Sequence, residues 1–455
     1  MTRGAEHFET ARTLGVELEK KPAERIVIIG MSALTPLGNT EQTLEGLNTG
    51  KSGIKPFNVN NFATNIAGTV DFDPEKYFSK KEMKEKSRLN AMTVVVCREA
   101  MGKAGLLGED GKLRKDINRR DVATWTGSAF GSGNLVIDVN NKIHENDNPT
   151  DTSDERSIKM TEGSKRVPVR SGLKLFPEEL NGGVAMDFGL SGWGGSSVEA
   201  CATGLSNIVE AAEAIKSGRA KIVIAGGFED VLTEHSEIGL SLFAAMRSVL
   251  STRNSDPERA SRPFDKDRDG FVLSAGGAAV VLAELNYALK IGAPILGEVL
   301  GFQKSMDGSD PTNLNKEIVA GTILGALYNE KAKGFYDVDA IFAHATSTKE
   351  GDLAEAAVLR IIFGEDLKNI PITAIKSNVG HLAGGAGAIN IVAALNALNV
   401  GKIPQIVNLE NPDPEVADLN FVRGEALVKD IKTALVLAYG FGGHNSVMLL
   451  GKYEK

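Results

Sequence analysis

The sequence predicts an α/β protein in which strands and helices alternate and build a parallel sheet covered on both faces. Short β-branched apolar runs recur along the chain, and stretches with apolar residues at helical spacing separate them. Several of these runs end in a loop of small and hydroxyl residues, which is where open α/β sheets place their sites. With 455 residues, of which 42% are hydrophobic, the chain suits two domains or one large duplicated fold.

Five segments carry the strand pattern: residues 25–34, 121–127, 220–230, 338–343 and 432–453. The last of them, KTALVLAYGFGGHNSVMLLGKY, predicts two strands joined by a glycine turn. A further apolar run, GFVLSAGGAAVVLA, predicts one buried strand or two.

The spacing of these segments allows two similar halves, residues 25–285 and 286–455, joined within residues 286–296. Two segments lie outside this alternation of strand and helix patterns. Residues 1–24 predict an N-terminal extension, and the strongly polar residues 141–166 predict an exposed excursion.

Charge and cysteine content limit the classes of function. The formal net charge is −8, which argues against general nucleic-acid binding. Two cysteines cannot build a disulfide framework or a cysteine-rich metal site, and this is typical of a reducing compartment. The N-terminus lacks the apolar core of a signal peptide, and no uncharged apolar run reaches the ~20 residues of a membrane helix. We therefore expect a soluble, cytoplasmic protein without a metal site.

Cys201 lies at the start of a predicted helix, because Leu205, Ile208, Ala212 and Ile215 follow it at helical spacing. The free amide N–H groups and the positive end of a helix dipole favour a thiolate, so we expect a lowered thiol pKa. The alternative is a buried structural cysteine, which is the interpretation we give to Cys97, within an apolar helical run.

Two of the six histidines have a setting that suits catalysis. His344 follows the predicted strand VDAIFA and begins the hydroxyl-rich loop HATSTKEGD. His381 lies in IKSNVGHLAGGAGA, where small residues allow close approach of the backbone. Each could be an ordinary core histidine. Together with a cysteine at a helix start they predict a Cys-His-His site, whose members need only be adjacent in space.

Over nearly its whole length the chain resembles the elongating β-ketoacyl-acyl carrier protein synthases, the KAS I/II condensing enzymes of the thiolase superfamily. The matching motifs are residues 200–204 (ACATG), residues 251–272 (STRNSDPERASRPFDKDRDGFV), the two histidine loops and the C-terminal GFGG. Three positions depart from the family pattern: Ala345 stands in place of Gly, Lys349 in place of Pro, and Ala275 in place of an acidic residue.

The resemblance implies a thiolase-like fold of two similar halves in a five-layer α-β-α-β-α arrangement. It also implies a decarboxylating Claisen condensation with Cys201 as nucleophile and with oxyanion donors from the backbone amides of Cys201 and Phe441. His344 and His381 would bind the enolate oxygen. Lys376 and Glu355 would form a buried ion pair that positions the histidines. Residues assigned to the pantetheine arm or acyl pocket are Thr346, Thr348, Phe441 and Gly442.

The resemblance further implies an acidic acyl carrier protein as partner, a homodimer, and no cofactor beyond the phosphopantetheine on the carrier. Lys80, Lys81, Lys84 and Arg88 would share one face of a helix and dock that carrier. A solvated charged face is the alternative for this run.

Five other interpretations are weighed against this one. A degradative thiolase needs a second cysteine after Cys201, which the chain lacks, and a starter-type synthase has Asn at the position of His381. A non-catalytic chain-length partner subunit typically lacks the nucleophile, and a thioesterase-like hydrolase does not account for the motifs. A polyketide-type ketosynthase stays open, as does the acyl length.

Overall fold

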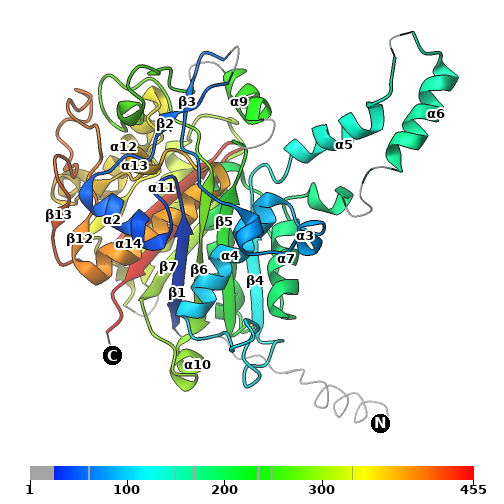
Figure 1. Ribbon diagram of the computed structural model, residues 1–455. Coiled ribbons are helices and arrows are strands. Elements are labelled where there is room, and N and C mark those ends of the chain that lie inside the picture. Colours follow the sequence, from blue (N-terminus) through cyan, green and yellow to red (C-terminus); the bar gives the residue numbers. More distant parts are fainter. Residues whose placement is uncertain are drawn as a thin grey trace.

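A mixed sheet runs through the molecule (Figure 1). The computed structural model describes residues 25–454 apart from 60–61, 149, 166, 168–170, 233–235, 247–248 and 330–331, so the extension expected at 1–24 lies outside the described residues. Within the described part, the sheet has nine strands in the order β11-β10-β14-β15-β7-β1-β6-β5-β4. Their bounds are β1 (Ile26–Leu34), β4 (Val122–Gly127), β5 (Ile222–Glu229), β6 (Gly276–Glu284), β7 (Gly297–Met306), β10 (Ala340–Phe342), β11 (Ile372–Thr373), β14 (Thr433–Gly440) and β15 (His444–Gly451).

The expectation of a parallel sheet is wrong for its centre. The pairs β1–β6, β5–β6, β1–β7, β7–β15 and β14–β15 are antiparallel, and only β4–β5, β10–β11 and β10–β14 are parallel. The predicted hairpin at 432–453 is confirmed and accounts for part of this. Its strands β14 and β15 are joined by three residues, and a connection that short permits only antiparallel pairing.

The strand order shows an internal duplication. From the centre outward, one half reads β1-β6-β5-β4 and the other reads β7-β15-β14-β10-β11. Each half begins with two antiparallel pairings and ends in parallel ones, and β1 and β7 meet at the centre through residues 26–28 and 297–299.

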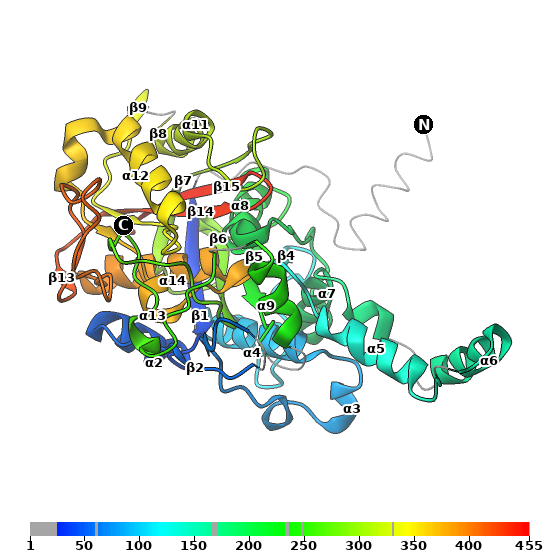
Figure 2. The same ribbon diagram turned by 90° about the horizontal axis from the view of Figure 1, so that it is seen from above.

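Helices form the other layers (Figures 1 and 2). α8 (Thr203–Lys216) and α14 (Ala386–Val400) pack on each other and share one apolar core with the inner faces of both halves of the sheet. α4 (Arg88–Lys103) and α7 (Glu179–Phe188) cover the outer face of the first half, and α11 (Lys316–Leu327) and α12 (Lys349–Phe363) cover that of the second. The result is the expected five-layer α-β-α-β-α arrangement.

The central helices approach the strands very closely. A Cβ atom on Gly227 of β5 would lie 2.5 Å from the Cα atom of Gly204 on α8, so a side chain there would push the two layers apart. The segment Ala383–Val400 is also apolar enough to cross a membrane by length and composition, but 89% of it is buried inside the protein. It is the central core helix of this fold.

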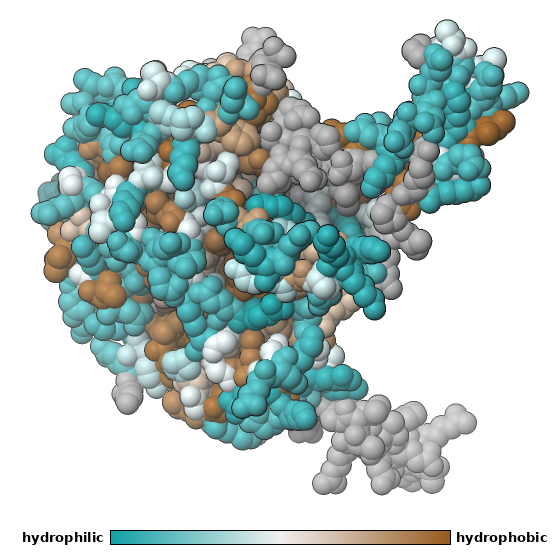
Figure 3. Space-filling view, viewed as in Figure 1, coloured by the Kyte–Doolittle hydropathy of each residue, from teal (hydrophilic) through white to brown (hydrophobic). Residues whose placement is uncertain are grey.

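The polar excursion forms an arm that stands away from the body (Figures 1 and 2). Its helices are α5 (Asn134–His144) and α6 (Ser153–Ser164), and Thr152 caps α6 in a capping box with Glu155. The expected exposure is confirmed, and the surface of the arm is largely hydrophilic (Figure 3).

The other helices and strands are α2 (Thr40–Thr49), α3 (Lys80–Met83), α9 (Ser236–Ala244), α10 (Leu285–Lys290), α13 (Lys376–Val379), and the strands β2 (Lys55–Pro56), β3 (Ile66–Ala67), β8 (Tyr328–Asn329), β9 (Gly334–Phe335), β12 (Lys402–Ile403) and β13 (Leu427–Val428).

Candidate active site

Cys201 lies in a 3-10 turn, Ala200–Ala202, that leads directly into α8. The predicted position at a helix start is therefore confirmed. Ala200 has a φ of 46°, which an alanine rarely adopts, and the turn is closed by a 2.8 Å hydrogen bond from the amide of Glu199 to the hydroxyl of Thr203. Backbone strain of this kind persists only where the surrounding structure holds the turn in place.

The expected lowering of the Cys201 pKa is wrong for this site. Burial raises the pKa of the thiol to about 12, and Glu229 adds to this rise while Lys376 opposes it. The partial positive charge at the helix start does not cancel this rise, because removing the thiolate from water costs more free energy than its attraction to the nearby N–H groups recovers.

A cavity of about 480 Å³ opens onto the sulfur. Most of the residues singled out in the sequence line it, although they come from distant parts of the chain: Cys201, His344, Thr346, Thr348, Glu355, His381 and Phe441. Lys376 and Gly442 are not among the residues that line it. Instead, the amide N–H of Gly442 donates a hydrogen bond of 2.7 Å to the carbonyl oxygen of Pro311. The structure thus brings the predicted cysteine and both histidines to one cavity.

The two imidazoles lie edge to face, with ring centroids 5.7 Å apart and an interplanar angle of 86°. The amide N–H of Tyr439 points at Nδ1 of His344, 3.3 Å away, so Nδ1 is the acceptor and Nε2 carries the proton. Burial, together with the charge of Lys376, lowers the pKa of both histidines well below 6.5. Both rings are therefore neutral at pH 7 and can each offer one N–H donor.

Lys376 and Glu355, the expected ion pair, are both buried and each charge acts on the pKa of the other group, but they do not touch directly. The carboxylate of Glu355 accepts backbone N–H groups of His344 at 2.8 Å and Ala345 at 2.7 Å. Lys376 Nζ donates to the carbonyl of His344 and lies 3.5 Å from its Nδ1. Among the described residues, no ion pair within 4 Å joins the lysine and the glutamate directly. Both groups hold the backbone of His344, from opposite sides.

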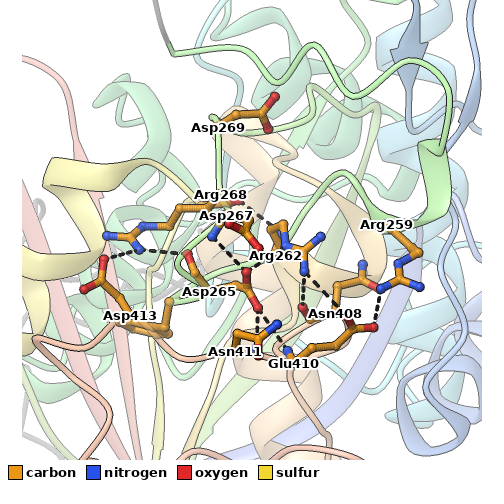
Figure 4. Close-up of polar contacts among 12 residues, drawn as sticks. Arg259, Arg262, Asp265, Asp267, Arg268, Asp269, Asn408, Glu410, Asn411 and Asp413 are labelled. Carbon is orange, nitrogen blue, oxygen red and sulfur yellow. Dashed lines mark hydrogen bonds and ion pairs between the residues drawn. The ribbon is translucent and has the colours of Figure 1, made fainter.

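The family-like segment 251–272 forms a network of polar contacts with residues 408–413 (Figure 4), and it also contacts the loop that follows His344. Arg268 has no exposed side-chain surface, pairs with Asp352 and Asp413, and donates to the carbonyls of Thr348 and Lys349. The amide of Arg262 donates to the hydroxyl of Ser347 at 3.0 Å. This segment is structural support for the loop that carries His344, Thr346 and Thr348.

The turn between β14 and β15 lies beside the nucleophile. A Cβ atom on Gly440 would lie 2.3 Å from the carbonyl oxygen of Glu199 and 3.3 Å from the amide nitrogen of Cys201, so the two segments can meet this closely only at a glycine. Gly442 and Gly443 have φ of 86° and 81°, values that glycine adopts without strain. Phe441 thus lies between two glycines and lines the same cavity as Cys201.

Comparisons with known proteins agree with this geometry. The family model described as "Beta-ketoacyl synthase, N-terminal domain" matches residues 23–288, and "Beta-ketoacyl synthase, C-terminal domain" matches residues 296–410. The chain belongs to the β-ketoacyl synthase family. It is 35% identical to the 3-oxoacyl-[acyl-carrier-protein] synthase 2 of Synechocystis sp. (strain PCC 6803), over 96% of this chain and 99% of that protein.

Solved β-ketoacyl synthases have the same fold. A β-ketoacyl synthase from Burkholderia phymatum STM815 superposes with a TM-score of 0.81 at 27% identity, covering 94% of this chain and all of that one. A type II polyketide ketosynthase in complex with its acyl-carrier protein, bound to a hexaketide, superposes with a TM-score of 0.80 at 25% identity, over 95% of this chain and all of that one. The fold of this synthase is therefore thiolase-like, as the sequence predicts.

The lysines expected at the carrier site do not lie on one long helix. Ser79 caps α3, which contains only Lys80–Met83, and Ser87 caps the separate helix α4. Lys80, Lys81 and Lys84 are exposed. Arg88 is not part of their face, because its guanidinium pairs with Asp230 and donates to the carbonyl of Phe72 at 3.0 Å. Two helix caps within nine residues are the signal that sequence reasoning missed.

Glu199 and Glu229 are two further acidic residues near the thiol that the sequence did not single out. Glu229 is fully buried, and burial raises its pKa to about 7. Its carboxylate accepts hydrogen bonds from the hydroxyl of Ser128, at 2.7 Å, and from the amide N–H groups of Ala129 and Gly384. It joins the loop after β4 to the loop of His381. An acidic residue at the end of the apolar run IVIAGGFE was the only available signal.

Proposed function

We propose that this synthase joins an acyl group held on Cys201 to the two-carbon unit of a malonyl-acyl carrier protein, in fatty-acid elongation. The products are a 3-oxoacyl-acyl carrier protein and carbon dioxide. One observation carries the proposal: a buried thiol and two neutral imidazoles line a single cavity, with a glycine-flanked amide beside the sulfur.

The first half-reaction is acyl transfer. The sulfur of Cys201 attacks the thioester carbonyl of the incoming acyl-carrier, and the oxyanion that forms accepts hydrogen bonds from the amides of Cys201 and Phe441. The carbon–sulfur bond to the carrier then breaks, and the thiol proton of Cys201 leaves with the carrier's pantetheine sulfur. The hydroxyls of Thr346 and Thr348 bind the pantetheine arm, and their position on the cavity wall, 2.9 Å from each other, supports this role.

The second half-reaction is decarboxylation and condensation. When the malonyl unit loses carbon dioxide, negative charge develops on its thioester oxygen, and the N–H groups of His344 and His381 stabilise that charge. The enolate carbon attacks the thioester carbonyl on Cys201, the bond to sulfur breaks, and the thiolate takes up a proton. A neutral imidazole still carries one N–H group, so each histidine can donate one hydrogen bond to that oxygen.

The acyl-enzyme is the species to detect. Intact-protein mass spectrometry after mixing with acyl-carriers of several lengths should show an acyl adduct on the wild-type chain and none on Cys201→Ala. Addition of malonyl-carrier should remove the adduct and release a 3-oxoacyl-carrier. An adduct that water alone removes, with no 3-oxoacyl product, would indicate a thioesterase-like hydrolase, and no adduct at any length would indicate a non-catalytic partner subunit.

A polyketide-type ketosynthase is the second candidate, favoured by the similarity to the polyketide ketosynthase that binds a hexaketide. The same panel separates the two. Saturated acyl chains that load and turn over support fatty-acid elongation, whereas loading restricted to 3-oxoacyl or unsaturated chains supports the polyketide type.

The proposal includes an acyl carrier protein as partner, and its docking site is formed by the exposed lysines of α3 together with Lys84, the residue that ends this helix. The three ammonium groups of Lys80, Lys81 and Lys84 suit an acidic carrier. The similarity to a ketosynthase solved with its carrier supports this choice of partner.

A homodimer in the cytoplasm is also part of the proposal. Beyond β4, residues 192–195 pair with that strand, through Gly192 to Val122 at 3.0 Å and Gly195 to Thr124 at 3.1 Å, and within the part of the chain that the structure describes no strand pairs with their other side. Large apolar side chains are exposed around this edge: Leu173, Phe176, Met186, Trp193 and Val198. An open strand edge beside apolar surface is what a second copy would cover.

A further inference from the structure

A cluster of charged side chains lies directly behind the nucleophile turn. The carboxylate of Glu199, two residues before Cys201, accepts a hydrogen bond of 2.6 Å from the ammonium group of Lys304 on β7. The same ammonium donates to Glu210 on α8 at 2.8 Å. The side chains of Glu199 and Lys304 are 16% and 24% exposed, so this pair is shielded enough to be stronger than a surface ion pair.

The second oxygen of Glu199 joins the nucleophile turn to β15. It accepts the hydroxyl of Ser206 at 2.6 Å, and Ser206 in turn lies 2.7 Å from the hydroxyl of Ser446. Since the proton of Ser206 is donated to Glu199, the proton in the second contact comes from Ser446. One carboxylate therefore connects α8, β7 and β15.

The same carboxylate reaches toward the oxyanion turn. Nδ1 of His444 is 3.9 Å from Glu199, and a Cβ atom on Gly442 would be 3.4 Å from the ring of His444. His444 thus lies between Glu199 and the turn that carries Phe441. The two amides assigned to the oxyanion belong to segments 240 residues apart, and this cluster lies at the place where those segments meet.

We propose that Glu199 is a positioning residue that keeps the amides of Cys201 and Phe441 aligned on one oxyanion. The inference rests on the proposed function, since it concerns the acyl-transfer step. An oxyanion hole needs donors fixed before the reaction begins, because donors that must reorganise lose most of their benefit. The strained φ of Ala200 makes such an external tie more necessary, because a strained turn relaxes when its support is removed.

The test compares two reactions of the same sulfur. Acylation by p-nitrophenyl acetate passes through an oxyanion, whereas alkylation by iodoacetamide is a direct displacement without one. Glu199→Ala should slow acylation about tenfold or more, a part of the ~10²–10³-fold loss that follows removal of one donor. Alkylation should stay within about twofold of wild type, and Glu199→Gln, which keeps neutral hydrogen bonds, should recover most of the acylation rate.

Glu210→Gln is the matched control, since Glu210 shares Lys304 but has no contact with the turn. It should leave both rates within about twofold of wild type. Equal losses of acylation and alkylation in Glu199→Ala would show that Glu199 supports only Cys201, and no loss of acylation in either Glu199 variant would show that it supports nothing. Either result overturns the proposal.

The ester needs no carrier protein, so the comparison is separate from the proposed function. A wild-type chain that reacts with the ester but forms no adduct from any acyl-carrier contradicts the condensing function. In that case the acylation-to-alkylation ratio of the Glu199 variants still decides the positioning role.

Discussion

The thiol of Cys201 is held in its protonated form by burial, and the charge of Lys376 opposes this only partly. Reactivity therefore depends on how much thiolate forms within the cavity. Lys376 does not line the cavity, but its ammonium group contacts His344, and its charge lowers the pKa of the thiol and of both histidines. A single buried cation tunes all three groups.

Alkylation of Cys201 should reflect this pKa. With a pKa of about 12, the thiolate fraction and hence the iodoacetamide rate should rise about tenfold per pH unit between pH 7 and 10. Burial lowers the pKa of Lys376 to about 8, so Lys376→Met removes a charge that is present at pH 7, and the alkylation rate at pH 7 should fall several-fold. Mass mapping of the modified residue, with Cys97→Ser as background, is the measurement. A rate that levels off below pH 8 contradicts the raised pKa.

Decarboxylation should depend on His344 more strongly than acyl transfer does. His344→Ala removes one donor to the enolate oxygen, so carbon dioxide release from malonyl-carrier should fall ~10²–10³-fold. The acyl adduct on Cys201 should still form at a rate within a few-fold of wild type. Comparable losses in both half-reactions would place His344 in acyl transfer as well, contrary to the division of roles proposed above.

At the scale of single elements, caps decide where the charged side chains go. The hydroxyl of Ser79 accepts a hydrogen bond from the amide of Glu82, and that of Ser87 accepts one from the amide of Asn90. These two caps begin α3 and α4 as separate helices, where the sequence predicts a single basic helix. The lysines of α3 stay in solvent, whereas Arg88 at the start of α4 turns toward Asp230. The basic surface is therefore smaller than the run of charges suggests.

Charge reversal on α3 should weaken carrier binding. Lys81→Glu with Lys84→Glu should raise KM for acyl-carrier several-fold, more at low salt than at high salt, and leave kcat nearly unchanged. Lys290→Glu, on exposed α10, carries the same kind of charge change away from the site and serves as control. A KM that stays constant in the double variant excludes α3 as the docking site.

At the scale of the whole molecule, the duplicated halves share one central pair of helices. α8 carries the nucleophile at its start, and α14 follows the loop of His381. Because both helices pack in the same core, the cysteine and the second histidine are held by one rigid unit. The α5–α6 arm lies outside that unit and has little contact with it (Figure 1).

Association should depend on the apolar surface near residues 192–195. Met186→Asp places a charge on an exposed position of α7, so folding should be preserved while a dimer is destabilised. Sedimentation velocity should show a dimer for the wild-type chain and a shift toward monomer for the variant. Val428→Asp, an equally exposed apolar position on β13, is the control. A wild-type chain that sediments as a monomer contradicts the homodimer.

Local features were predictable from the sequence because their causes lie within a few residues. The helix after Cys201 follows from apolar spacing, and the β14–β15 hairpin follows from its glycine turn. The exposure of residues 141–166 follows from composition. The family-like motifs predicted the five layers, which periodicity alone did not, since it favoured a parallel sheet.

The sequence by itself determined which residues bear the chemistry: one cysteine at a helix start, two histidines in small-residue loops, and a glycine turn. Only the tertiary structure decided what those residues do to one another. The raised pKa of the thiol, the binding of Glu355 to backbone amides and the tie from Glu199 all arise between segments far apart in the chain. The physical reason is that burial and charge act through space, whereas periodicity and caps act along the chain.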